Sequence, residues 1–112
     1  MGRFQYGGHA KVEIEDRALA HLQFVIGSKL RRGEPFYFTW REDRSTGEGR
    51  TTVWLHPSAQ LSFRFFGSRQ PALNRAWLEA LALTANSTAG LHLVPEPART
   101  SGDTAADGEL IG

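Results

Sequence analysis

The chain has 112 residues, 40% of them hydrophobic, with 13 basic and 12 acidic residues and a formal net charge of +1. This length suits one small domain with a single hydrophobic core. The absence of cysteine excludes disulfides, thiolate metal sites and cysteine nucleophiles, and no apolar run approaches the ~18 residues of a membrane-spanning helix. With no apolar leader at its start, the sequence predicts a cytoplasmic protein without membrane contacts.

The N-terminal third predicts a β-hairpin followed by a helix. Residues 4–6 and 11–14 flank the pair Gly7-Gly8, which allows the positive φ of a tight turn. Asp16 stands where a carboxylate caps a helix, and apolar residues then recur with a 3.6-residue period over residues 17–32. Gly33 follows a cationic last turn, at the position where glycine often ends a helix.

Three strands, a second helix and a short last strand are predicted next. Apolar and polar residues alternate over residues 36–41, 52–56 and 61–66, as in half-buried strands. Pro71 is typical of the first turn of a helix, and residues 91–94 favour a strand. The order ββαβββαβ predicts an α+β two-layer sandwich, in which both helices cover one face of a mainly antiparallel sheet.

We expect residues 1–94 to form this single α+β domain and residues 95–112 to form a disordered acidic tail. The tail contains four acidic residues against Arg99 alone, and it lacks aromatic residues and periodicity. Such a segment buries too little apolar surface to offset the entropy lost on ordering. Residues 1–94 then carry a net charge of about +4.

The sequence favours a non-catalytic domain over an enzyme, although it does not exclude an enzyme. The four histidines are His9, His21, His56 and His92, and no pair has the spacing of metal ligands, so we interpret them as facing solvent. No Gly-x-Ser-x-Gly nucleophile motif and no Gly-x-x-x-x-Gly-Lys phosphate loop occurs. We therefore predict no catalytic residue, no metal and no cofactor.

Ser68, Arg69 and Arg75 form a candidate anion-binding site. They lie around the predicted start of the second helix, where free N–H groups and the helix dipole favour a phosphate or a carboxylate. The purely structural alternative is that Ser68 or Gln70 caps the helix while Arg69 pairs with Glu79 or another acid.

The sheet face turned away from the helices is a second candidate, for a ligand or an interface. Its aromatic and cationic members are Tyr37, Arg41, Trp54, His56, Arg64, Phe66 and His92. Sheets that bind nucleic acid use such faces to stack bases and neutralise phosphates. A contiguous aromatic patch also serves dimerisation. Because the net charge is modest, we favour a self-associating interaction domain, with a nucleic-acid-binding accessory module as the alternative.

Phe24 and Gly27 are a candidate helix interface, because on a helical wheel they fall opposite the core stripe together with Ala20. A phenylalanine beside a glycine allows close approach of two helices across a two-fold axis. A single exposed phenylalanine is also common on protein surfaces.

Four runs of residues follow one another in a recognisable pattern. They are Asp16-Arg17-Ala18-Leu19-Ala20-His21-Leu22, Lys29-Leu30-Arg31-Arg32-Gly33-Glu34-Pro35-Phe36, Val53-Trp54-Leu55-His56-Pro57 and Gly67-Ser68-Arg69-Gln70-Pro71-Ala72-Leu73-Asn74-Arg75-Ala76-Trp77. The pattern resembles a family of short uncharacterised actinobacterial proteins, a domain of unknown function, over roughly residues 1–95. The resemblance implies no assigned activity.

Members of that family are often labelled ATP-dependent DNA ligases, and the residues do not support this label. Such ligases attack the nucleotide with the lysine of a Lys-x-Asp-Gly motif, because an amine nucleophile is required. The two lysines here stand in Lys11-Val12-Glu13-Ile14 and Lys29-Leu30-Arg31-Arg32. The resemblance therefore links the chain to DNA ligation only through the label, as part of the nucleic-acid alternative.

Overall fold

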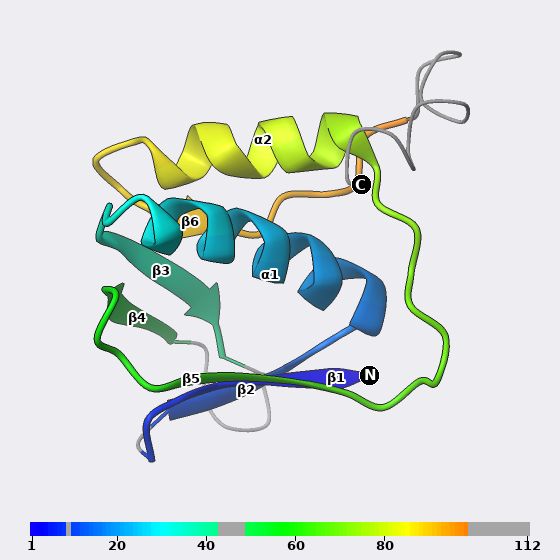
Figure 1. The fold of residues 1–112 in the computed structure, drawn as a ribbon, viewed down its shortest axis with the longest axis horizontal. Helices are drawn as coiled ribbons and strands as arrows, with labels where there is room; N and C mark the ends of the chain where they lie inside the picture. The colour runs from blue at the N-terminus through cyan, green and yellow to red at the C-terminus, as the bar shows by residue number, and fades with distance from the viewer. Residues whose placement is uncertain (9, 43–48, 99–112) are drawn as a thin grey trace.

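A computed structural model describes residues 1–8, 10–42 and 49–98 (Figure 1). Its elements are β1 (Gly2–Tyr6), β2 (Ala10–Ile14), α1 (Asp16–Arg31), β3 (Phe36–Arg41), β4 (Arg50–Leu55), β5 (Leu61–Phe65), α2 (Arg75–Ala85) and β6 (Leu91–His92). The predicted α+β class and the order ββαβββαβ are therefore confirmed. Neither of these two helices is long and apolar enough to cross a membrane.

The strands form two three-stranded sheets, where the sequence predicted one. The first sheet has the order β2-β1-β5 and is antiparallel, while the second has the order β4-β3-β6. β3 pairs antiparallel with β4, but it pairs parallel with β6 and only at Phe38 and Thr39. Gly90 allows this close approach, because its φ is +91° and a Cβ there would lie 2.6 Å from the carbonyl oxygen of Tyr37.

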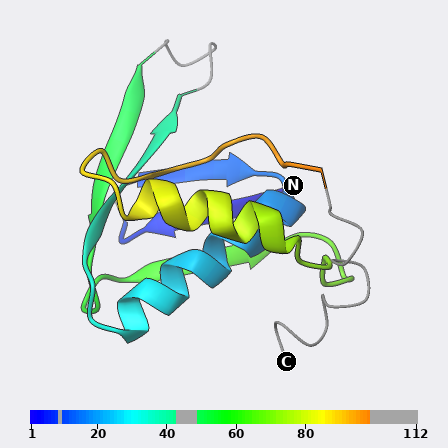
Figure 2. The ribbon, with the colours of Figure 1, turned by 90° about the horizontal axis from the view of Figure 1, so that it is seen from above.

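The two helices and the two sheets share one hydrophobic core. α1 and α2 lie side by side above the strands (Figure 2). The Phe4 ring of the first sheet meets the Phe38 and Trp40 rings of the second sheet edge-on, at centroid distances of 5.2 and 5.9 Å. These aromatic contacts join the two sheets, since offset and edge-to-face pairs add to the free energy of burial. Among the described residues, the aliphatic side chains buried completely are Leu19, Leu22, Ile26, Leu55, Leu81 and Leu91.

Helix α1 begins one residue earlier than predicted, and Asp16 does not cap it. Glu15 occupies the N-cap position without a side-chain hydrogen bond. The Asp16 carboxylate instead accepts hydrogen bonds from the backbone N–H groups of Phe66 and Gly67, at 3.4 and 2.8 Å. It thus ties the end of β5 to the start of α1. Gly33 has a φ of +73° just beyond the helix, in agreement with the predicted end.

Helix α2 begins at Arg75, so the prediction that Pro71 lies in its first turn is wrong. Asn74 is the N-cap, and its side-chain oxygen accepts a hydrogen bond from the Ala76 N–H at 3.0 Å. An asparagine at this position satisfies one of the free N–H groups of the first turn. Residues 66–74 are therefore an irregular link between β5 and α2.

Residues 93–98, which we call the strap, cross the N-terminal ends of both helices. The Trp77 indole N–H donates to the Val94 carbonyl at 2.9 Å. The Asn74 side-chain amide donates to the Glu96 carboxylate at 2.9 Å and to the Pro97 carbonyl at 3.0 Å. Residues 95–98 thus belong to the domain rather than to the predicted tail, because polar contacts hold them where apolar anchors are lacking. Residues 99–112 lie outside the described residues.

Candidate functional site

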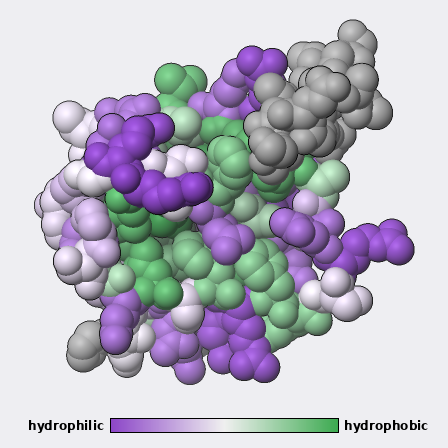
Figure 3. All heavy atoms as spheres, in the orientation of Figure 1, coloured by the Kyte–Doolittle hydropathy of each residue, from purple (hydrophilic) through white to green (hydrophobic). Residues whose placement is uncertain are grey.

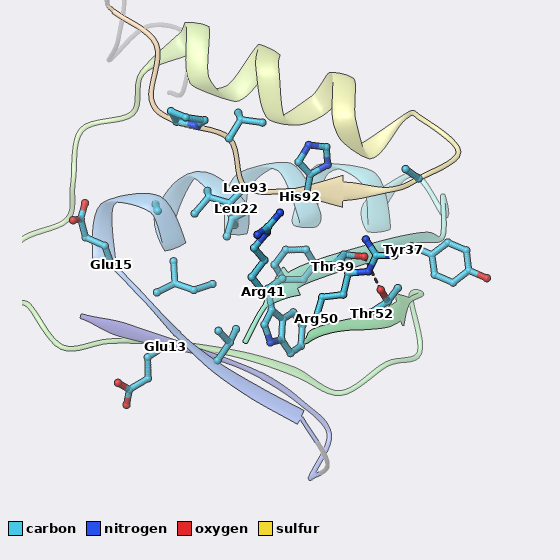
Figure 4. Close-up of a pocket in the computed structure, with 18 of the residues that line it drawn as sticks. Glu13, Glu15, Leu22, Tyr37, Thr39, Arg41, Arg50, Thr52, His92 and Leu93 are labelled. Carbon is cyan, nitrogen blue, oxygen red and sulfur yellow. Dashed lines mark hydrogen bonds between the residues drawn. The ribbon is translucent and has the colours of Figure 1, made fainter. Parts of the chain in front are cut away.

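A groove of about 1060 Å³ lies between the two sheets (Figure 4). Its walls are residues 12–15 of β2 and the turn to α1, residues 37–41 of β3 with Arg50 and Thr52 of β4, and His92 of β6 with residues 93–95 of the strap. Ala18, Leu22 and Trp77 of the helices close its inner end. Most of this lining is apolar, which is typical of ligand sites.

Two arginines lie together at the rim of the groove. Arg41 and Arg50 occupy paired positions on β3 and β4, and both are exposed. Figure 4 shows Arg41 extending toward His92 and Leu93, with Arg50 beside it. Within residues 1–8, 10–42 and 49–98, neither guanidinium takes part in an ion pair. Like charges directly opposite each other destabilise a sheet, so an anion between them would relieve an unfavourable pair.

The inner wall of the groove contains a polar group without a partner. Trp40 is 8% exposed, and its indole N–H has no hydrogen bond among the described residues. A buried donor left unsatisfied costs free energy. Other atoms of the residue line the groove, but the indole nitrogen itself is buried and is not open to a ligand there.

Two hydroxyl groups and an aromatic pair continue the outer side of the second sheet. The hydroxyls of Thr39 and Thr52 are hydrogen-bonded to each other at 2.7 Å. The rings of Tyr37 and Trp54 meet edge-on at 4.8 Å, and these residues are 47% and 44% exposed. An aromatic pair left this open to solvent is available for contact with a partner molecule.

The predicted sheet-face site divides between the two sheets. Tyr37, Arg41, Trp54 and His92 belong to the second sheet, and the half-buried His56 directly follows β4. Arg64 belongs to β5 of the first sheet, and Phe66 directly follows that strand. The Phe66 ring is contacted there by the guanidinium groups of Arg64 at 5.6 Å and Arg3 at 6.0 Å. The expectation of one patch over adjacent strands is therefore wrong.

The predicted anion site at the start of α2 is not assembled. Ser68 and Arg69 lie in the exposed link before Asn74, beside a hollow of about 290 Å³, and not at the helix terminus. Arg75 pairs with Glu79 at 3.4 Å. The structural alternative differs in its residues, because Asn74 rather than Ser68 or Gln70 caps the helix and Arg75 rather than Arg69 pairs with Glu79. The corrected start of α2 also removes the geometric reason for grouping the three residues.

Phe24 and Gly27 of α1 are half-buried, and Ala20 on the same side is buried. α1 lies in front in the view of Figure 1, and the same view in Figure 3 shows apolar surface bordered by polar side chains. The outward face predicted for these residues is therefore only partly exposed. Their use in a dimer stays a prediction.

His21 is fully buried, so the prediction that it faces solvent is wrong. Its Nε2 accepts a hydrogen bond from the backbone N–H of Asn74 at 2.7 Å, and its Nδ1 therefore donates to the Arg17 carbonyl at 2.7 Å. The ring packs on Trp77 at a centroid distance of 4.5 Å. The signal was present in the sequence, because His21 follows Ala18 by three residues and precedes Val25 by four on the buried stripe. His9 lies outside the described residues.

Arg17 and Glu96 join α1 to the strap by a bidentate ion pair. The guanidinium donates to both carboxylate oxygens, at 2.9 and 2.6 Å, and to the Ala72 carbonyl at 2.7 Å. The hydrogen bonds from Arg17, together with the one from Asn74, lower the pKa of Glu96 from 4.5 to about 2. Because the strap also lines the groove, this pair holds one of its walls.

Glu96→Gln is expected to make the free energy of unfolding depend less on pH in the acid range. A pKa depressed in the folded state gives stability that is complete above pH 4.5 and is lost as the pH falls through about 2. Both side chains are about 30% exposed, so the expected loss above pH 4.5 is only about 1 kcal/mol. Urea unfolding of both proteins between pH 7 and pH 2 measures it, with Glu79→Gln as the control. Parallel profiles for wild type and Glu96→Gln would contradict this assignment.

The fold and the groove define a small α+β domain with a cleft between two sheets, whose lining includes Arg41 and Arg50 as well as Glu13 and Glu15. No cluster of three His, Cys, Asp or Glu side chains able to hold a metal occurs in the part of the chain that the structure describes. The chain belongs to the family described as a domain of unknown function (DUF7882), whose model matches residues 1–96. No curated protein and no solved structure matches the chain.

Proposed function

We propose that this protein is a non-catalytic binding domain that takes an anionic ligand in the groove between its sheets. The observation that carries the proposal is the pair Arg41 and Arg50, which are directly paired on the adjacent strands β3 and β4 at the rim. Guanidinium groups bind carboxylates and phosphates through paired hydrogen bonds. A bound anion would therefore offset the repulsion between the two arginines.

The hydroxyl groups of the groove support binding rather than a reaction. Those of Thr39 and Thr52 are bonded to each other and not to a general base. Nucleophilic catalysis needs a base within hydrogen-bond distance of the nucleophile. The lining is apolar with a charged rim, an arrangement that orients a ligand. The cysteine-free sequence supports a cytoplasmic location for this role.

The double variant Arg41→Ala, Arg50→Ala is expected to lose anion binding. Calorimetric titration with a short oligoglutamate and with a short oligothymidylate presents the groove with carboxylates and phosphates. We expect wild type to bind at least one probe, more weakly as salt rises, and the double variant to bind about tenfold or more weakly. Arg64→Ala, on the other sheet, is the matched control. Failure of both probes to bind, or equal losses in the control, would refute the proposal.

Self-association is a second candidate role, favoured by the exposed pair Tyr37 and Trp54. Each aromatic side chain buries roughly 150–250 Å² when it is covered, so two copies related by a two-fold axis would both gain. Arg41 then lies toward the rim of the interface, where solvated charge costs little.

We expect wild type to be a dimer at micromolar concentration and Trp54→Ser to be a monomer. Size-exclusion chromatography with light scattering gives the molar mass directly. Phe24→Ser is the comparison, because it removes an aromatic ring from α1 and leaves the sheet unchanged. A monomeric wild type would exclude self-association, and the aromatic pair would then be a candidate ligand-binding surface. A dimer disrupted by Phe24→Ser but not by Trp54→Ser would show that the interface lies on α1.

A further inference from the structure

His21 contacts the start of α2 through a hydrogen bond that only its neutral ring can make. The side chain is fully buried, and its Nε2 and Nδ1 lie 2.7 Å from the Asn74 N–H and from the Arg17 carbonyl. A backbone N–H can only donate, and a carbonyl can only accept. Nε2 must therefore lack a hydrogen while Nδ1 carries one, so this arrangement does not accommodate the imidazolium form.

Protonation of Nε2 would place two donors against each other. The added hydrogen would point at the Asn74 N–H, and the charged ring would be buried, which is costly. Asn74 would then have to move away from His21. The same residue caps α2 at Ala76, and its side-chain amide donates to Glu96 and Pro97 of the strap. Its displacement would therefore break two of the contacts that hold the strap.

Among the described residues, the charged groups that these contacts place beside His21 are Arg17, one turn earlier on α1, and Glu96 on the strap. Asn74 of the link and Trp77 of α2 also face the ring, and neither carries a charge. Arg17 opposes a positive ring and Glu96 favours one, so their ion pair makes the two effects largely offset each other. Hydrogen bonds lower the pKa of Glu96 to about 2. Within this cluster, His21 is therefore the group that changes charge in mild acid.

The strap is the part of this region that can open without disturbing the core. None of residues 93–98 is buried, and Leu93 is 45% exposed. Val94 packs on the core only in part, and the other contacts that hold the strap are polar. Segments with little buried apolar surface open at a lower free energy than the core elements do. Loss of the Asn74 contacts is therefore expected to free the strap before the helices separate from the sheets.

We propose that protonation of His21 releases the strap from the helix ends, so that the groove loses the wall formed by residues 93–95 in mild acid. The inference goes beyond the proposed function, because release of the strap is measured on the protein alone. The open form takes up one proton, so its population rises by up to about tenfold for each pH unit below about 6.5, where imidazole ordinarily titrates.

The Trp77 indole N–H reports on the strap, since it donates to the Val94 carbonyl. Its hydrogen exchange is followed by NMR on wild type and corrected for the intrinsic pH dependence of the exchange reaction. We expect the Trp77 signal to lose protection by up to about tenfold per pH unit from about pH 6.5 to about pH 4.5. The Trp40 indole nitrogen is buried, so its N–H should stay better protected than that of Trp77 throughout.

His21→Gln is the test variant, because its amide offers one acceptor and one donor side by side but does not titrate. We expect the pH dependence of the Trp77 exchange to disappear in this variant. His92→Gln is the matched control, because it removes an imidazole from β6, directly before the strap. It should keep the wild-type pH dependence.

Four outcomes would overturn the inference. Constant Trp77 protection across this pH range in wild type would exclude an acid-triggered release. Equal protection of Trp77 and Trp40 would show that the whole domain unfolds instead. An unchanged pH dependence in His21→Gln, or its loss in His92→Gln, would exclude His21 as the trigger. If His21→Gln does not fold, the wild-type exchange and the His92→Gln control still decide against or for the release.

Discussion

Replacement of Trp77 by alanine is expected to lower the free energy of unfolding by about 3–5 kcal/mol. Trp77 is 4% exposed and packs on His21. Its indole N–H also holds the strap at Val94, so the substitution removes apolar burial, a ring contact and a hydrogen bond together. Since small domains have total stabilities of about 5–15 kcal/mol, a large share of the molecules would be unfolded.

Urea unfolding followed by circular dichroism measures this loss. Leu83→Ala is the matched control, because Leu83 lies on the same helix but is 74% exposed. We expect that change to stay within about 0.5 kcal/mol of wild type. Trp77→Phe keeps an aromatic ring but lacks the N–H, so it should fall between the two. A nearly neutral Trp77→Ala would mean that the register of α2 is wrong.

Replacement of His21 by leucine is expected to cost about 2–4 kcal/mol, although the side chain stays large and apolar. The Asn74 N–H and the Arg17 carbonyl would each lose a hydrogen bond of 2.7 Å. Asn74 is itself fully buried, so water cannot readily replace the lost partner. The loss therefore comes from unsatisfied polar groups rather than from a cavity.

His56→Leu is the control for this second substitution. His56 is half-buried and directly follows β4, so the same chemical change there should cost far less. Chemical unfolding of both variants at pH 7 is the measurement. Equal losses would show that the hydrogen bonds of His21 contribute nothing particular to stability.

The elements could be predicted from the sequence because their patterns are local. The alternation of Phe36 and Phe38 with Tyr37, for example, places the first two in the core and the third outside, as observed. The pairing of β1 with β5 could not be predicted in this way, because a strand shows which face is buried and not which neighbour it has. The prediction of a single sheet was wrong for this reason.

The exposure of individual site residues could be predicted from the sequence, but the groove that brings them together could not. Tyr37, Trp54 and Phe66 are exposed, as the alternation indicated. The groove exists because two sheets face each other, and no local pattern reveals that arrangement. Arg50 was missed because it lies in a polar stretch outside the predicted strands 36–41 and 52–56, and only its pairing with Arg41 makes it part of the site.

The central place of β1 in the first sheet affects the order in which the chain can fold. β1 meets β2 across a short turn, but it meets β5 only after residues 7–60 have intervened. The β3–β4 hairpin lies wholly within that interval. Closure of a long loop costs entropy before its contacts form, and such long-range contacts slow folding. During synthesis, the N-terminal hairpin must therefore wait, with Phe4 still uncovered by β5, until the ribosome has delivered more than half of the chain.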